Sequence, residues 1–330
     1  MIGVCGAGSW GTALAATLAR NTSDQIYFWS RDVDTTHEIN ATHANSKYLP
    51  GIVLPENILG CADIATLLKN VDDVLIVVPS KAFVDVLRLI KPHLHARHRI
   101  IWATKGLEPH RGRFLHEVAI EELGSSLKYA ILAGPSFATE VAKQLPTAVT
   151  ISTNDPSFGA DLVKYFHSDT FRVYISTDII GVQVGGVMKN ILAVAAGLSD
   201  GLGFGANARA ALITRGLAEM MRFGVSLGAK IETLQGLAGI GDVILTCTDN
   251  QSRNRRFGLA LAGGKSIAVA QAEIGQIVEA VHNTAEICRI AVEKNIELPI
   301  AEQVNKIFTE EVTPQQAVQN LITRKPSYEW

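Results

Sequence analysis

Charged residues, cysteines and any excess of one sign of charge are scarce in this sequence. Only 19% of the 330 residues are charged while 47% are hydrophobic, and the formal net charge is −2. Disorder requires low hydrophobicity and high net charge, so it is excluded. Dedicated nucleic-acid-binding proteins usually carry a strong basic excess, so we expect no nucleic-acid partner. The 28 glycines follow no fixed period, which excludes collagen-like and solenoid folds.

Long apolar runs and targeting signals are also missing. No stretch reaches the roughly 18 consecutive apolar residues of a membrane-spanning segment, and the best candidate, Ile191–Leu198, is short. The first basic residue is Arg20, so we expect no secretory signal. The cysteines show neither a C-x-x-C pair nor zinc spacing, so we expect no metal site and interpret them as small buried side chains in a reducing cytosol. They are Cys5, Cys61, Cys247 and Cys288.

Apolar runs alternate with helical stretches through about residue 175. Near-continuous apolar runs are typical of parallel strands covered on both faces. The predicted strands are Ile2–Cys5, Ile26–Trp29, Val74–Val78, Ile100–Thr104, Ala130–Ala133, Ala148–Ser152 and Phe171–Ile175. The predicted crossover helices are Thr12–Arg20, Lys81–Ile90 and Arg113–Leu123. This alternation predicts a Rossmann-type, doubly wound α/β domain over residues 1–177.

Strand patterns nearly vanish after Asp178, which predicts an all-helical second domain over residues 178–330. Asp178 and Asn207 are predicted N-caps, and Gly197 and Gly228 are predicted C-terminal stops. The predicted helices are Asp178–Leu198, Asn207–Leu227, Ile267–Val281, Thr284–Lys294 and Ile300–Phe308. Glycine-rich loops are predicted at Leu202–Gly205 and Gly236–Gly241.

A glycine-rich segment, Gly6-Ala7-Gly8-Ser9-Trp10-Gly11, follows the first predicted strand and opens the first helix. In this context G-x-G-x-x-G is the dinucleotide-binding fingerprint. Gly6 permits the tight turn, Gly8 lets a pyrophosphate approach the backbone, and Gly11 lets helix and strand pack closely. The helix N-terminus offers unpaired N–H groups to the phosphates. The alternative is a tight turn that binds no ligand.

The end of the second strand bears on which dinucleotide binds. NAD sites usually place an acidic residue about 20 residues after the glycines to bind the ribose hydroxyls. Here the sequence reads Ser30-Arg31-Asp32, and Arg31 can pair bidentately with a 2′-phosphate. We expect NADP(H) to be accepted and preferred, while Asp32 leaves NAD(H) possible. The alternative is that Arg31 is an ordinary exposed arginine.

Polar residues follow the next three strands, where ligands of an open parallel sheet bind. The segments are Pro79-Ser80, Lys105-Gly106 and Gly134-Pro135-Ser136-Phe137. Lys105 is expected near the cofactor, in contact with a phosphorylated or carboxylated substrate, and Gly134 and Ser136 can add hydrogen bonds. Each is alternatively an ordinary loop residue.

Lys189 is the only basic residue in the apolar helix predicted over Asp178–Leu198. The residues three and four positions away, which lie on the same helix face, are Gly185, Gly186, Leu192 and Ala193. Small residues allow close approach, and burying a lysine is costly unless it has a partner or a task. Desolvation would lower its pKa toward about 7–8, the range of a proton donor and acceptor. The alternative is a lysine that extends to water.

Anion-binding side chains cluster further along the chain, at Ser252, Arg253 and Asn254. Arginine can grip an anion with two parallel hydrogen bonds, so a small phosphorylated substrate is the expected ligand. Asp242 is a candidate buried carboxylate that orients or balances a lysine, and its alternative role is a helix N-cap.

Six motifs in order carry a resemblance to a known family over nearly the whole chain. They are Gly6–Gly11, Trp102–Leu107, Gly134–Ala138, Gly185–Asn190, Asp200–Asn207 and Cys247–Asn254. The sequence resembles the bacterial NAD(P)-dependent sn-glycerol-3-phosphate dehydrogenases. The resemblance implies a 6-phosphogluconate-dehydrogenase-like fold and a soluble cytoplasmic enzyme, often dimeric, with no membrane partner. It implies reduction of dihydroxyacetone phosphate to sn-glycerol 3-phosphate for glycerophospholipid synthesis.

The resemblance also implies roles for individual residues, with Lys189 as the acid/base residue. The residues implied to contact substrate are Lys105, Gly134, Ser136, Asp242, Ser252, Arg253 and Asn254. Those implied to line the cofactor site, besides Gly6, Gly8 and Gly11, are Ser9, Trp10, Arg31, Tyr48, Lys105, Ala138, Arg253, Ile277 or Val278, and Glu279. Nothing is implied for the stretch after Phe308.

Three other functions stay open at this point. A β-hydroxyacid-type dehydrogenase shares the two-domain plan and a helix lysine. A cofactor-binding protein without catalysis would bind NADPH but oxidise it with no phosphorylated ketone. An S-adenosylmethionine methyltransferase typically needs an acidic residue where Ser30-Arg31 stands, so it ranks last.

Overall fold

The chain forms two compact units in the computed structural model, which describes residues 1–325 and Tyr328. Unit 1 comprises Met1–Glu108 and Arg113–Gln183, and unit 2 comprises Pro109–Gly112 and Val184–Trp330. The predicted boundary at residue 177 stays a prediction. The contacts divide the chain between Gln183 and Val184, inside a helix.

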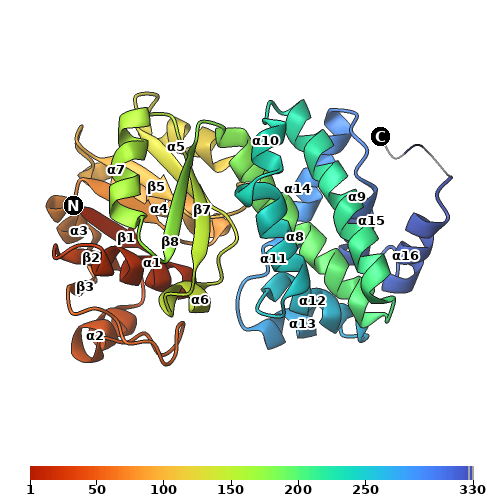
Figure 1. Cartoon of the computed structure of the whole chain (residues 1–330), viewed down its shortest axis with the longest axis horizontal. Helices are drawn as coiled ribbons and strands as arrows, with labels where there is room; N and C mark the ends of the chain where they lie inside the picture. The colour runs from red at the N-terminus through yellow and green to blue at the C-terminus, as the bar shows by residue number, and fades with distance from the viewer. Residues whose placement is uncertain (326–327, 329–330) are drawn as a thin grey trace. The chain divides into compact units, whose positions relative to one another are not determined.

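Unit 1 is built on one eight-stranded sheet (Figure 1). Its strand order is β3-β2-β1-β4-β5-β6-β7-β8, and every neighbouring pair is parallel except β6 and β7. The strands are β1 (Ile2–Cys5), β2 (Ile26–Trp29), β3 (Ile58–Cys61), β4 (Asp73–Ile76), β5 (Arg99–Trp102), β6 (Tyr129–Ala133), β7 (Thr147–Thr153) and β8 (Phe171–Ser176). The central strands are buried on both faces, as their apolar runs predict.

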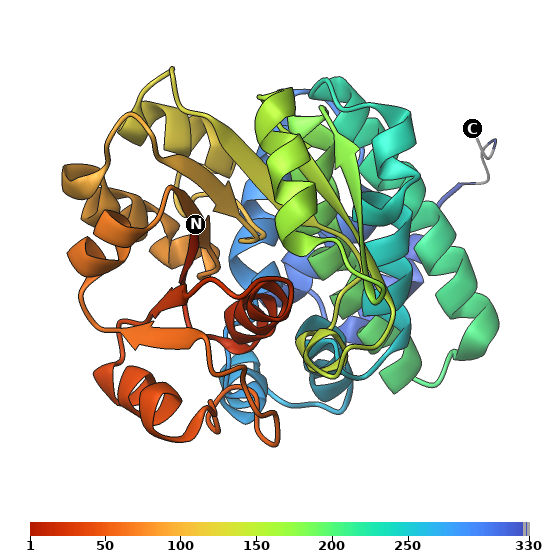
Figure 2. The same cartoon turned by 60° about the vertical axis from the view of Figure 1, so that its left-hand side comes forward.

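Helices cover both faces of this sheet. They are α1 (Ser9–Arg20), α2 (Val33–Thr42), α3 (Ile64–Asn70), α4 (Ser80–Ile90), α5 (Leu115–Leu123), α6 (Ala138–Ala142) and α7 (Pro156–Phe166). Apolar side chains of α1 and α7 share one core cluster with β1, β4 and β5. On the opposite face Phe83 of α4 meets Trp102 of β5 edge to face. Figure 2 shows the same sheet from another side, with the red α1 against it.

The register of the parallel strands aligns their carboxyl ends. Cys5 at the end of β1 pairs with Trp29 of β2 and Ile76 of β4, and Ile76 pairs with Trp102 of β5. The loops that follow these strands therefore leave from one edge of the sheet. This is the edge where an open α/β sheet binds its ligands.

The prediction for unit 1 was wrong in three respects. It did not include helices α2, α3, α6 and α7. Strand β3 was missed, because a four-residue segment that contains Gly60 gives little strand signal. Strand β7 was grouped with the parallel strands but runs antiparallel to β6. An apolar run indicates burial and not direction, and the short α6 returns the chain to the same edge.

Unit 2 is helical in all its described elements. They are α8 (Ile179–Gly201), which begins in unit 1, α9 (Gly205–Ser226), α10 (Ile231–Leu234), a π-helical turn (Leu237–Gly241), α11 (Asp242–Thr248), α12 (Arg253–Ala262), α13 (Ile267–Ile274), α14 (Ala280–Glu293), α15 (Pro299–Phe308) and α16 (Pro314–Ile322). Two of the predicted helix-end residues are confirmed. Asp178 accepts a hydrogen bond from the Gly181 N–H at 2.8 Å, and Gly228 follows α9 with φ +93°.

Other predicted boundaries in unit 2 were wrong. Asn207 lies inside α9, which begins at Gly205. Gly197 lies inside α8, where a Cβ would meet the Arg255 carbonyl oxygen at 2.1 Å, so its small size serves helix packing. The helix predicted over Ile267–Val281 is interrupted at Gly275, which is left-handed with φ +65°. The predicted loop Gly236–Gly241 is mostly a π-helical turn.

The apolar character of α8 comes from burial. Among the described residues it is the one helix long and apolar enough to cross a membrane, and 83% of that stretch is buried inside the protein. A mostly buried helix of this kind is the core helix of a globular unit. The four cysteines are free thiols; Cys288 is half-buried and the other three are buried.

Candidate functional site

The glycine-rich segment has the geometry of a phosphate-binding turn. Gly6 has φ +116°, and a Cβ there would lie 2.3 Å from the Val77 carbonyl oxygen, so only glycine fits. A Cβ on Gly8, in contrast, would meet nothing within 4 Å, which leaves open space over the start of α1. Gly8 is also the N-cap of α1 and provides no side-chain cap. The first turn of α1 therefore faces open space with its N–H groups uncapped, as a dinucleotide pyrophosphate requires.

The turn after β2 holds both residues that bear on the choice of dinucleotide. Arg31 is exposed. Asp32 caps α2 by accepting the Asp34 N–H at 3.2 Å, and it also pairs with Lys47 at 3.1 Å. The Lys47 ammonium is the main reason that the pKa of Asp32 lies below its ordinary value. Asp32 is therefore a charged carboxylate that already has a cation.

Three predicted residues meet after β5 and β6. The Lys105 ammonium and the Ser136 hydroxyl both donate to the Gly134 carbonyl oxygen, at 3.4 and 3.1 Å. Gly134 has φ +140°, which favours glycine. Two other predicted residues, Trp10 and Ala138, are partly buried against the core of unit 1.

An ion pair that is largely shielded from solvent joins α8 to α11 in unit 2. The Lys189 ammonium on α8 donates to Asp242 Oδ1 on α11 at 2.6 Å, and their side chains are 12% and 1% exposed. Lys189 also donates to the Thr246 hydroxyl at 3.2 Å. Lys189 therefore does not extend freely into water, and Asp242 is not an N-cap, because Gly241 occupies that position. The predicted lowering of the Lys189 pKa stays a prediction.

Small residues on α8 make this contact possible. A Cβ on Gly185 would lie 2.1 Å from the Ala238 carbonyl oxygen, so the π-helical turn packs directly on the α8 backbone. That turn leads straight into Asp242, the first residue of α11. Gly185 and the π-helical turn together bring Asp242 to Lys189.

The predicted anion-binding residues form the start of α12. Ser252 is its N-cap, with its hydroxyl accepting the Arg255 N–H at 3.2 Å. Asn254 donates to Asn190 Oδ1 at 2.9 Å, and Asn190 directly follows Lys189. The N-terminus of α12, which attracts anions, is thereby fixed to the part of α8 that carries Lys189.

The segment 276–280 is held against the same helix end. The exposed Arg253 donates to Gln276 Oε1 at 2.8 Å, and the Ala280 N–H reaches Asn254 Oδ1 at 3.4 Å. Ile277 and Glu279 lie within this segment and are half-buried. Predicted cofactor and substrate residues of unit 2 thus come together around the start of α12.

An ion pair joins α12 to α8, in addition to the Asn190–Asn254 hydrogen bond. Arg255, which is 7% exposed, donates to Asp200 Oδ2 at 2.6 Å, and Arg209 of α9 donates to the same oxygen at 2.8 Å. The Nε atom of Arg255 has no hydrogen-bond partner among the described residues. The Arg255–Asp200 ion pair holds α12 at the point where the α12 backbone crosses Gly197 of α8.

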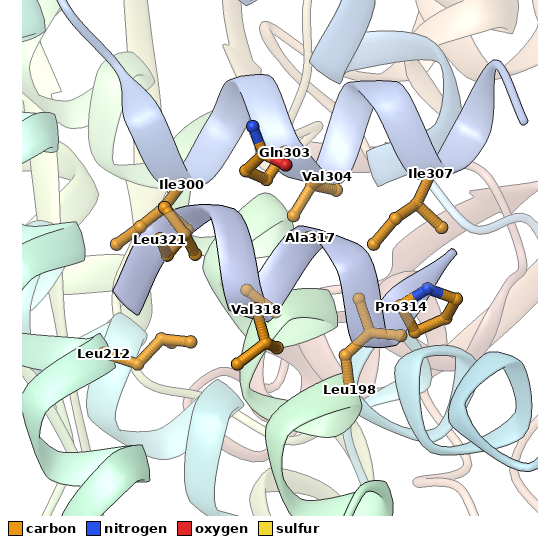
Figure 3. A pocket seen from close by; sticks show the side chains of 11 residues that line it. Leu198, Leu212, Ile300, Gln303, Val304, Ile307, Pro314, Ala317, Val318 and Leu321 are labelled. Atoms are coloured by element: carbon orange, nitrogen blue, oxygen red, sulfur yellow. The ribbon is translucent and has the colours of Figure 1, made fainter. Parts of the chain in front are cut away.

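Sequence reasoning missed Thr246 as a partner of Lys189. The spacing could have indicated this partner, since Thr246 is four residues after Asp242 and residues at that spacing share a helix face. An apolar pocket in unit 2 contains no predicted site residue (Figure 3). Apart from Gln303 and Pro314 it is lined by aliphatic side chains of α8, α9, α15 and α16, so it does not suit a phosphorylated ligand.

Comparison with known proteins gives the family. The N-terminal family profile, NAD-dependent glycerol-3-phosphate dehydrogenase N-terminus, matches residues 1–159. The C-terminal profile of the same enzymes matches residues 178–319. The chain belongs to the NAD-dependent glycerol-3-phosphate dehydrogenase family. The Rossmann-type sheet and the helical second unit are the fold of that family.

Relatives and a solved structure of this family match over nearly their full length. The chain is 51% identical over 323 residues to a glycerol-3-phosphate dehydrogenase [NAD(P)+] of Idiomarina loihiensis, covering 98% of this chain and 97% of the relative. It is 49% identical over 327 residues to one of Vibrio cholerae, covering 99% and 95%. A crystal structure of glycerol-3-phosphate dehydrogenase from Coxiella burnetii superposes with a TM-score of 0.94 at 50% identity, covering 98% of each chain.

Proposed function

We propose that this protein reduces dihydroxyacetone phosphate to sn-glycerol 3-phosphate with NAD(P)H, in a reversible reaction. The observation that carries the proposal is the buried Lys189–Asp242 pair in a member of this family. The family match favours this activity over a β-hydroxyacid-type dehydrogenase, a protein that only binds the cofactor, and a methyltransferase.

Lys189 is the proposed proton donor. Its ammonium holds a proton at Nζ and donates it to the ketone oxygen of the substrate as that oxygen becomes a hydroxyl. Asp242 and Thr246 fix the position of Nζ through contacts of 2.6 and 3.2 Å. The positive charge of Lys189 also stabilises the negative charge that develops on the oxygen. In the reverse reaction, neutral Lys189 accepts the proton.

The start of α12 is the proposed binding site for the substrate phosphate. Arg253 and Asn254 supply side-chain donors, and Ser252 caps the helix end. A phosphate held away from the reacting carbon contributes orientation rather than chemistry. The Asn190–Asn254 hydrogen bond holds this end of α12 at a fixed position relative to the proton donor, because Asn190 directly follows Lys189.

The sheet edge of unit 1 is the proposed dinucleotide site. Gly6, Gly8, Ser9, Trp10 and Gly11 form the turn for the pyrophosphate, and the open space over Gly8 fits that group. When bound, NAD(P)H supplies the hydride that reduces the ketone carbon. The further residues proposed to bind the cofactor are Arg31, Tyr48, Lys105, Ala138, Arg253, Ile277 and Glu279. The residues proposed to contact the substrate also include Lys105, Gly134, Ser136 and Asp242.

The test is an absorbance assay with NADPH and NADH supplied separately. Oxidation of either cofactor that depends on dihydroxyacetone phosphate is the expected result. A β-keto acid serves as the matched alternative substrate. Turnover of the β-keto acid alone would favour the β-hydroxyacid-type reaction, and no turnover of any ketone despite NADPH binding would indicate a binding protein.

Cellular context is also proposed from the family resemblance. We propose that the protein works in the cytoplasm as a homodimer and that its product enters glycerophospholipid synthesis. Analytical ultracentrifugation tests the dimer. Growth of a depleted strain with and without added glycerol 3-phosphate tests the link to phospholipids.

A further inference from the structure

The segment Asn45–Tyr48 is anchored on the dinucleotide-binding turn. The Asn45 side chain, 1% exposed, donates to the Ala7 carbonyl oxygen and to the Thr12 hydroxyl, both at 2.9 Å. The Ser9 hydroxyl donates to the Tyr48 carbonyl oxygen at 2.6 Å. A residue between these two anchors therefore has a fixed place beside the turn. Lys47 is one of the two residues between these anchors.

Lys47 extends from this anchored segment to the end of β2. Its ammonium lies 3.1 Å from Asp32 Oδ2, while Asp32 Oδ1 accepts the Asp34 N–H. Both oxygens of Asp32 are therefore engaged. An acidic residue here binds the ribose hydroxyls of NAD and repels the 2′-phosphate of NADP, unless its charge is cancelled.

We propose that Lys47 determines cofactor specificity, because it cancels the charge of Asp32 and so lets Arg31 accept the 2′-phosphate of NADP(H). The proposal rests on the proposed function, since it concerns the dinucleotide that the reaction uses. Arg31 is exposed and makes no ion pair among the described residues, so its guanidinium is available to a phosphate. The pair Lys47–Asp32 thus converts an NAD-type position into one that tolerates NADP.

The competing explanation is an ordinary surface ion pair. Lys47 and Asp32 are 60% and 39% exposed, and exposed pairs contribute little to stability. That explanation predicts no difference between ligands with and without a 2′-phosphate. The two explanations therefore differ in ligand selectivity and not in stability.

The experiment measures binding of adenosine 2′,5′-bisphosphate and of 5′-AMP by calorimetry. These fragments differ in the 2′-phosphate and lack the nicotinamide, so the test stays readable even if the protein does not reduce dihydroxyacetone phosphate. The variants are Lys47→Met, Asp32→Asn and their combination. Lys164→Met is the matched control, because Lys164 is exposed and pairs with Asp161 at 3.0 Å.

Lys47→Met is expected to weaken binding of the bisphosphate about fivefold to tenfold, because the uncancelled charge of Asp32 then repels the 2′-phosphate, and to leave binding of 5′-AMP unchanged. Because Asp32→Asn keeps an oxygen for the α2 cap, the double variant is expected to regain most of that affinity. The control is expected to change neither ligand. Equal losses for both ligands, no loss for either, or a double variant as weak as Lys47→Met would overturn the proposal.

Discussion

The two units each contain a buried ion pair, and the cation differs. In unit 1 the Arg99 guanidinium grips the fully buried Asp73 with two hydrogen bonds of 2.6 and 2.8 Å, at the amino ends of β4 and β5. In unit 2 the Lys189 ammonium meets Asp242 at 2.6 Å. The first pair lies at the sheet edge opposite the glycine-rich turn, and the second lies beside the proposed phosphate site.

The difference teaches which buried pair can take part in chemistry. A guanidinium does not lose its proton in proteins, and hydrogen bonding to Asp73 raises the pKa of Arg99 still further. Arg99 also pairs with Asp161 and lies over the Phe158 ring, so its role is structural. An ammonium can give up and regain a proton, so of these two cations Lys189 is the one that we propose takes part in the reaction.

Removing the lysine should have the largest effect. Lys189→Met is expected to lower kcat by about 10³-fold, a typical loss for a general acid, while NADPH binding is unchanged. Steady-state kinetics and NADPH fluorescence measure the two quantities. Because the variant leaves Asp242 buried without its cation, Lys189→Met/Asp242→Asn is the control for folding. Activity near the wild-type level in either variant would refute the role of Lys189.

Breaking the structural pair should affect stability and not the reaction. Arg99→Met is expected to reduce the free energy of unfolding by about 3 kcal/mol, because it leaves Asp73 charged and buried. Urea denaturation measures this quantity, and kcat at a temperature where the variant is folded is expected to be unchanged. A large loss of kcat with normal stability would contradict the contrast between the two pairs.

The phosphate site should separate substrate binding from proton transfer. Arg253→Ala is expected to raise KM for dihydroxyacetone phosphate about thirtyfold with a smaller change in kcat, as for loss of a charged hydrogen-bond donor. Arg256→Ala is the matched control, because Arg256 is exposed on the same helix. If both variants show the same KM, Arg253 does not hold the phosphate.

A third buried carboxyl, Glu219, extends the comparison, because no lysine or arginine of the described residues is hydrogen-bonded to it. Glu219 is 2% exposed and accepts the Ile300 N–H at 2.7 Å, and burial raises its pKa from 4.5 to about 7. The folded state therefore binds this proton more tightly than the unfolded state does. The free energy of unfolding should fall by about 3 kcal/mol as pH rises from below 4.5 to above 7.

Glu219→Gln should remove that part of the pH dependence and keep an acceptor for the start of α15. Urea denaturation at several pH values compares the two proteins. An identical pH dependence would show that Glu219 titrates normally in the folded state.

Much of the fold could be predicted, because buried strands leave apolar runs in the sequence. The direction of β7 could not, since burial on both faces is the same for either direction. The candidate residues Lys189 and Asp242 were each predictable from their local patterns. Their contact was not, because it depends on a π-helical turn packed on Gly185. Lys47 gave no local signal, since its anchors are contacts made by Ser9 and Asn45.

The most direct test of the central claim is kcat of Lys189→Arg with NADPH and dihydroxyacetone phosphate. This substitution keeps the positive charge and a partner for Asp242 but removes a proton that can be transferred at working pH. We predict that kcat falls by at least about 10²-fold while NADPH binding is unchanged. A kcat within about twofold of the wild type would contradict the account, because charge alone would then suffice.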